Sequence, residues 1–139
     1  MKNTKQHLVV VYGTLRKGQS NHYLLENEGA AYIGDGTVKG YGMIPLGGFP
    51  GAVPLEQGEI KTEMYSVDDS VLARLDMLEG HPNFYRRTPV DFIDKKGNVQ
   101  KAEIYVLQRA AGSRPFIKSG DWVEFNSLSY NDRNAALTS

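Results

Sequence analysis

The chain has 139 residues, which fits one domain of ordinary size. Its 16 basic and 16 acidic side chains balance to a formal net charge of zero. The chain therefore lacks the excess positive charge that binding to nucleic acid or to an anionic membrane favours. The absence of cysteine excludes disulfides, thiolate catalysis and zinc–cysteine sites. We therefore expect a small-molecule or protein partner, and no feature of the sequence specifies an oligomeric state.

The N-terminal segment is polar up to His7, and the apolar run that follows covers only residues 8–11. A secretory signal needs about 7–15 apolar residues and a membrane span about 20. We therefore expect neither a signal peptide nor a membrane-spanning segment. The lack of cysteine agrees with a reducing compartment, so a cytoplasmic location is expected.

Residues 8–12 form an apolar, β-branched run that stops at Gly13. Because successive residues are apolar rather than alternating, this run predicts a buried strand. The chain then enters a glycine-containing loop. Either Ser20 or Asn21 can cap a short helix, which should end near Gly29.

Glycine and proline punctuate residues 30–59, so no helix of useful length is expected there. Short, bent strands, as at the corners of a small barrel, suit this composition. Farther along, alternating apolar residues, an N-cap over residues 68–70 and a hairpin turn over 94–98 indicate longer elements. They are strands over 58–67, 84–93 and 99–107 and a helix over 71–80.

The apolar periodicity fades after Arg109, and residues 126–139 are rich in Asn, Ser, Asp and Thr. Such a composition is typical of a loosely attached segment. We therefore expect one α+β domain over residues 6–125, in which strands dominate, followed by a flexible tail over 126–139.

The first candidate site is the loop that begins Tyr12-Gly13-Thr14-Leu15. A strand that runs into such a loop and then a helix can aim successive backbone N–H groups at one anion. The loop nearly matches a nucleotide phosphate loop, but Gln19 stands where that motif requires lysine, and the alternating strands and helices of that fold are missing. An ordinary strand-to-helix turn is the alternative interpretation.

The second candidate site lies on the helix over residues 71–80. At about 100° per residue its apolar side chains form one stripe centred near Leu75, and Glu79 falls only about 40° from Leu75. Burial and the negative end of the helix dipole both raise the pKa of such a carboxyl group towards the range of a general acid/base. The alternative is a surface glutamate, or one that pairs with Arg86 or Arg87.

Residues after this helix could complete a pocket beside Glu79. Tyr85, with Arg86 or Arg87, is placed to line it, and the alternative is that the arginines form the solvated face of a strand. Asp76 should lie at the edge of the apolar stripe. The three histidines are scattered without metal-ligand spacing, so no metal site is expected.

These motifs resemble the γ-glutamylcyclotransferase-like superfamily, and most closely its γ-glutamylamine cyclotransferase branch. The resemblance covers roughly residues 8–122, and the order and spacing of its short motifs make it specific. It implies a small mixed β-barrel of about six to seven strands, with a short helix after the first strand and a helix across one mouth. The motifs that carry it are residues 12–18, 21–22, 58–65, 75–80, 85–87, 102–105 and 120–122.

The resemblance implies that a γ-glutamyl amine or amide, such as γ-glutamyl-ε-lysine, is cyclised to 5-oxoproline with release of the free amine. Glu79 corresponds to the catalytic glutamate, and no metal or cofactor is required. Two alternatives stay open: a module that binds a γ-glutamyl or amino-acid ligand without turnover, and an enzyme that acts on another acyl amide. The residues expected to bind substrate are Tyr12, Gly13, Thr14, Leu15 and Tyr85.

Overall fold

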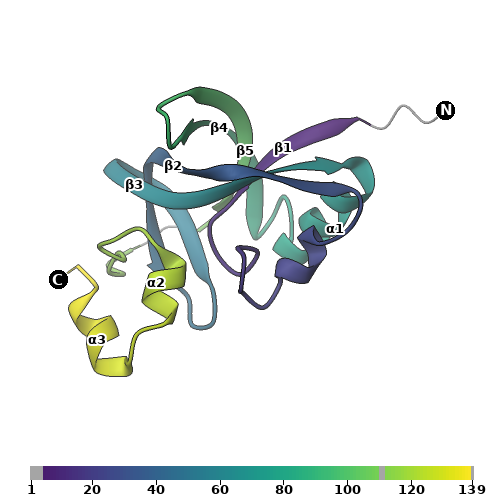
Figure 1. Cartoon of the computed structure of the whole chain (residues 1–139). Coiled ribbons are helices and arrows are strands. Elements are labelled where there is room, and N and C mark those ends of the chain that lie inside the picture. Colours follow the sequence, from purple (N-terminus) through teal and green to yellow (C-terminus); the bar gives the residue numbers. More distant parts are fainter. Residues whose placement is uncertain (1–4, 110–111, 139) are drawn as a thin grey trace.

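The computed structural model describes residues 5–109 and 112–138. Five strands close into a barrel in the order β1-β3-β2-β4-β5 (Figure 1). Strands β1 and β5 are parallel where they close the barrel, whereas the other neighbours in this order are antiparallel. The mixed barrel of the expected α+β class is therefore confirmed. The strands are β1 (Gln6–Val11), β2 (Ala30–Pro45), β3 (Pro50–Asp68), β4 (Tyr85–Asp94) and β5 (Val99–Leu107).

The number of strands is five rather than the expected six to seven, because the short pieces predicted over residues 30–59 join into longer strands. Strands β2 and β3 pair along most of their length, with register shifts between Tyr32 and Gly34 and between Lys39 and Tyr41. Such shifts bend a strand without ending it. The glycines and prolines in this region therefore curve the sheet instead of dividing it.

Alternate residues of the strands enter two different apolar clusters, because successive side chains point to opposite faces of a sheet. One cluster fills the barrel and includes Val10, Met64 and Ile104. The other lies on the outer face and includes Val9 and Tyr65. The outer cluster is the one that the helix expected over residues 71–80 covers.

That helix is α1 (Asp69–Glu79), and it begins two residues before its expected start. The Asp68 side chain caps it by accepting a hydrogen bond from the backbone N–H of Val71 at 2.9 Å. Gly80 ends it in the left-handed conformation, with φ of 64°. Leu72 and Leu75 are buried in the outer cluster, so α1 packs on the wall of the barrel.

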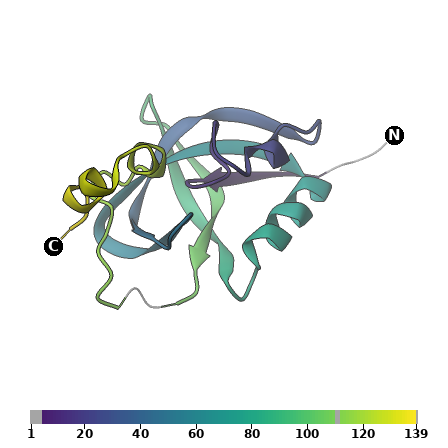
Figure 2. The same ribbon diagram turned by 90° about the horizontal axis from the view of Figure 1, so that it is seen from below.

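The short helix expected after the first strand is the 3₁₀ helix η1 (His22–Leu25). Helices α2 (Trp122–Asn126) and α3 (Tyr130–Ala135) lie together on another side of the barrel (Figure 2). Trp122 and Phe125 enter the interior cluster, so α2 is the helix at the mouth of the barrel. Within the described residues, no helix is long and apolar enough to cross a membrane.

The segment expected as a flexible tail packs on the domain. It contains α3, and Leu137 pairs with Ile117 in an isolated β-bridge. The Lys118 N–H donates to the carbonyl oxygen of Ala136 at 2.9 Å, and the Thr138 N–H donates to that of Phe116 at 2.9 Å. This packing corrects the expectation of a loose attachment from residue 126 onwards.

Candidate active site

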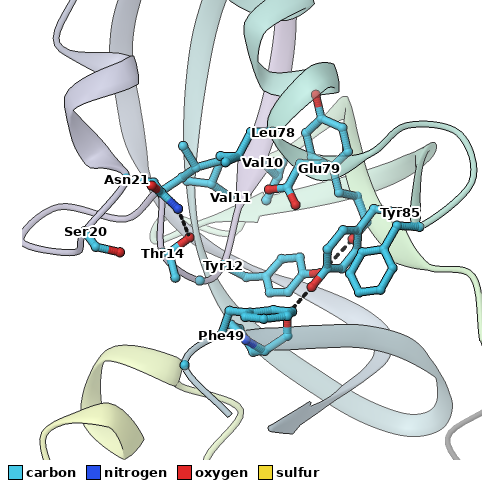
Figure 3. Close-up of a pocket in the computed structure, with 16 residues that line it drawn as sticks. Val10, Val11, Tyr12, Thr14, Ser20, Asn21, Phe49, Leu78, Glu79 and Tyr85 are labelled. Carbon is cyan, nitrogen blue, oxygen red and sulfur yellow. Dashed lines mark hydrogen bonds between the residues drawn. The ribbon is translucent and has the colours of Figure 1, made fainter. Parts of the chain in front are cut away.

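A pocket of about 370 Å³ opens beside the loop after β1, the end of α1 and the turn between β2 and β3 (Figure 3). This volume suits a small ligand. The structure brings all the sequence-predicted site residues to this pocket, although they come from three separate segments of the chain. They are Tyr12, Gly13, Thr14, Leu15, Glu79 and Tyr85.

The loop after β1 lines the pocket with residues whose backbone N–H groups are unpaired in the described structure. In the described residues, no acceptor takes a hydrogen bond from the N–H of Gly13, Thr14 or Leu15. The Gly13 carbonyl oxygen accepts a bond from the Arg16 N–H at 3.0 Å, which closes a turn in this loop. Consecutive unpaired N–H groups form a site for an anion such as a carboxylate.

Residues of the following turn hold this loop in place. The Asn21 backbone N–H donates to the carbonyl oxygen of Thr14 and its side-chain amide donates to the Thr14 hydroxyl, both at 2.9 Å. The His22 ring nitrogen Nδ1 lies 2.9 Å from the carbonyl oxygen of Leu15. The Asn21 side chain therefore braces the loop, and it does not cap η1 as the sequence had suggested.

An ion-pair network lies behind the loop. The buried Glu63 carboxylate accepts hydrogen bonds from Arg16 Nε and from the Lys17 backbone N–H, each at 3.0 Å. Arg16 Nη1 also donates to Asp121 Oδ1 at 2.9 Å. The network ties the loop to β3 and to the start of α2. Sequence reasoning assigned no role to Arg16 or Glu63, although residues 58–65 and 120–122 belonged to the motifs of the resemblance.

The Glu79 carboxylate points into the pocket from the last turn of α1 (Figure 3). Burial raises its pKa from the ordinary 4.5 to about 7. Burial and then the charge of Glu79 also raise the pKa of Tyr85. Within the described part of the chain, Glu79 has no hydrogen bond or ion pair that would hold it ionised. A carboxyl group in this state can both take and return a proton near neutral pH.

Arg86 and Arg87 were considered as partners for Glu79, and Arg87 binds other carboxylates. Arg87 Nε lies 2.7 Å from Asp76 Oδ1, and its Nη1 lies 2.8 Å from Glu103 Oε1. The Tyr105 hydroxyl also donates to Asp76, at 2.7 Å. Asp76 therefore serves the packing of α1 on the barrel, and Glu79 is the carboxylate that faces the pocket.

Two tyrosines contribute ring faces rather than free hydroxyl groups. The Tyr12 hydroxyl donates to the carbonyl oxygen of Tyr105 at 2.7 Å and accepts from the N–H of Ala52 at 3.0 Å. The Tyr85 hydroxyl donates to the carbonyl oxygen of Pro50 at 2.6 Å. These bonds fix the two rings as walls of the pocket.

Leu78, Phe49 and Phe84 are among the apolar lining residues that were missed as site residues. Leu78 was expected in the buried stripe of the helix, but it is 42% exposed because α1 ends at the next residue and its last turn borders the pocket. Phe49 lies in a turn without periodicity, and Phe84 was expected only as the first residue of a strand. Of these three residues, only Leu78 belonged to a pattern in the sequence, the apolar stripe of the helix.

Residues 5–109 and 112–138 contain no group of three or more His, Cys, Asp or Glu side chains that could hold a metal ion. The ionisable lining groups of the pocket are Glu79 and three tyrosines. The chemistry that this arrangement can perform is therefore proton transfer at Glu79 beside an anion held by the loop.

Comparison with known proteins agrees with this geometry. The family described as "Gamma-glutamyl cyclotransferase, AIG2-like" matches residues 9–124. The chain belongs to this family. A Vibrio cholerae relative, which carries a provisional gamma-glutamylcyclotransferase name, is 39% identical over 120 residues that cover 86% of this chain and 97% of the relative.

Two further relatives bear on the family assignment. The gamma-glutamylcyclotransferase family protein YtfP of Escherichia coli K12 is 34% identical over 116 residues, which cover 84% of this chain and 96% of YtfP. The crystal structure of an AIG2-like protein of Mus musculus superposes with a TM-score of 0.74 at 26% identity, covering 84% of this chain and 88% of the mouse chain. Family membership supports an enzyme of the gamma-glutamylcyclotransferase type.

Proposed function

We propose that this chain converts a γ-glutamylamine to 5-oxoproline and the free amine, with Glu79 as the general acid/base. The observation that supports the proposal most is that one pocket combines a carboxyl group of pKa about 7 with the unpaired N–H groups of the loop. A γ-glutamyl compound carries the matching groups, an α-carboxylate beside an α-ammonium. The proposal includes a small-molecule substrate and a cytoplasmic location.

In the proposed complex, the N–H groups of Gly13, Thr14 and Leu15 bind the α-carboxylate. Their bracing by Asn21 means that they need little reorganisation when the ligand arrives. The α-ammonium then lies towards Glu79, and the chain of the substrate folds back so that its γ-carbonyl carbon faces the α-nitrogen. Holding these two atoms close is the main task of the pocket, because well-oriented intramolecular reactions have effective molarities up to about 10⁸ M.

Glu79 starts the reaction by taking one proton from the α-ammonium. The freed amine attacks the γ-carbonyl carbon, and a new C–N bond closes the five-membered ring. The bond between that carbon and the leaving nitrogen then breaks. Of the three ammonium protons, one stays on the lactam nitrogen and two pass through Glu79 to the amine, which departs as an ammonium ion. Glu79 ends ionised, as it began.

The substrate supplies its own nucleophile in this reaction, so no side chain of the protein needs to form a covalent bond. This suits a pocket whose lining includes no cysteine and whose two wall tyrosines donate their hydroxyl protons to backbone carbonyls. The rate then depends on ring-closing geometry and on one titrating carboxyl group.

The test is to incubate the protein with γ-glutamyl amines, γ-glutamyl amino acids and glutathione, and to measure 5-oxoproline by mass spectrometry. Release of 5-oxoproline together with the free amine in equal amounts is the expected result. If the folded protein releases no 5-oxoproline from any of these compounds, the proposal is refuted. Saturable binding of these compounds without turnover would instead support the ligand-binding module considered from the sequence.

A further inference from the structure

One end of the pocket is apolar and aromatic. The loop with Thr14 and Asn21 forms one side and Tyr85 lies across the pocket from it, with Phe49 along the lower edge of the view (Figure 3). If the loop holds the α-carboxylate and Glu79 faces the reacting nitrogen, the group attached to the leaving amine must extend towards the aromatic side. This end therefore selects the amine.

Three aromatic rings from two segments form this end. Phe49 comes from the turn between β2 and β3, and its ring centroid lies 6.3 Å from that of Phe84 at an interplanar angle of 61°. Phe84 in turn packs edge-to-face on Tyr85 at 4.9 Å and 85°. Phe49 and Phe84 nevertheless remain 38% and 36% exposed. An apolar group placed against them would remove this surface from water, which stabilises a complex.

The rings of the aromatic end offer little to an ionised amine substituent. In the described structure, no Lys, Arg or His lines the pocket, so a carboxylate on the leaving group would lose hydration against apolar rings. A cationic substituent is disfavoured for another reason. The Arg109 guanidinium already lies over the Phe84 ring, with its carbon 5.5 Å from the ring centroid, and would repel a second cation.

We infer that the substrates of this enzyme are γ-glutamyl conjugates of neutral, apolar amines, whose hydrocarbon group packs against Phe49 and Phe84. This inference rests on the proposed function and narrows its leaving group. It disfavours the zwitterionic lysine of γ-glutamyl-ε-lysine, as well as amino acids and polyamines. The reaction is the one given above, with the apolar amine leaving as its ammonium ion.

The experiment compares kcat/KM for three conjugates of similar size, measured as 5-oxoproline release. They are γ-glutamyl isobutylamide, γ-glutamylglycine and the mono-γ-glutamyl amide of ethylenediamine, which are neutral, anionic and cationic at the amine end. The isobutylamide should exceed both charged conjugates by about tenfold or more, in line with the discrimination that an apolar pocket provides. A γ-glutamyl benzylamide should also be turned over faster than the charged conjugates.

Two variants link this preference to the aromatic end. Phe49→Ala and Phe84→Ala should each lower kcat/KM for the isobutylamide by roughly tenfold and reduce the difference between the neutral and charged conjugates. Tyr130→Ala is the matched control, because Tyr130 is an aromatic residue that is 79% exposed on α3 and does not line the pocket. It should keep the preference of the wild type.

The outcomes separate this inference from the function on which it rests. Equal rates for the three conjugates, or faster turnover of a charged one, would overturn the inference and leave the cyclotransferase standing. Faster turnover of γ-glutamylglycine would further indicate that Arg109 serves as a carboxylate partner. An absence of 5-oxoproline from every conjugate would overturn the proposed function, and the inference with it.

Discussion

Replacing Glu79 with glutamine removes a carboxyl group whose burial raises its pKa from 4.5 to about 7. The folded protein therefore binds this proton more tightly than the unfolded chain does. Glu79 contributes this stability fully below pH 4.5 and loses it as the pH rises through about 7. The two pKa values correspond to at most roughly 3 kcal/mol of unfolding free energy, because one pKa unit is worth about 1.36 kcal/mol and the half-buried side chain keeps some water.

The wild type and Glu79→Gln should therefore have similar stability at pH 4.5, apart from a constant offset for the amide. At pH 8 the variant should be more stable by up to about 3 kcal/mol. This gain corresponds to roughly 10 °C in Tm for a domain of this size. The assay is urea unfolding of both proteins between pH 4.5 and 8, since the difference between the two curves cancels the titration of all other groups.

Asp76→Asn is the matched control on the same helix, one turn earlier. It breaks the ion pair with Arg87 and weakens the bond to Tyr105, so it should lose stability at neutral pH. Parallel pH curves for the wild type and Glu79→Gln would refute the reasoning. A Glu79→Gln variant that is less stable than the wild type at pH 8 would also refute the reasoning. That result would indicate that Glu79 is an ionised carboxylate with a structural partner.

Three other predictions concern the loop and the C-terminal segment. A Cβ atom at Gly13 would lie 2.8 Å from the side chain of Pro50, so Gly13→Val should raise KM while the protein stays folded by circular dichroism. Glu63→Gln removes the ion pair to Arg16, and it should raise KM with little change in kcat and cost about 1–3 kcal/mol in urea unfolding. Deletion of residues 127–139 exposes apolar surface at the barrel mouth and should lower Tm by roughly 5 °C in a thermal melt, and an unchanged Tm would favour the loose tail expected from the sequence.

Local signals in the sequence predicted the helix that carries Glu79. The polar run around Asp68 supplies the cap and Gly80 supplies the left-handed end, and both depend on contacts within a few residues. The apolar stripe of this helix also predicted that Glu79 points inwards. Local signals did not predict that this helix lies beside the loop after β1. That position depends on the pairing of β1 with β3, and only the resemblance to a family indicated it.

The rest of the site depends on contacts between distant segments. Phe49 and Phe84 meet across 35 residues of sequence, and neither lies in a periodic pattern. Glu63 alternates with apolar residues in β3, which is the pattern of an exposed strand position. It is buried because the loop carrying Arg16 crosses over it and provides an ion pair. Such burial follows from the assembled fold and has no local signature.

The role of Glu79 is tested by 5-oxoproline release from the conjugate that the wild type turns over fastest, measured for the wild type, Glu79→Gln and Asp76→Asn. Glu79→Gln should lower kcat by about 10²–10⁴, the usual contribution of a positioned acid/base, while binding of the conjugate is kept. Asp76→Asn should have a smaller effect. A Glu79→Gln protein that keeps the wild-type rate, or a larger loss in Asp76→Asn, would contradict the assignment of Glu79 as the proton carrier.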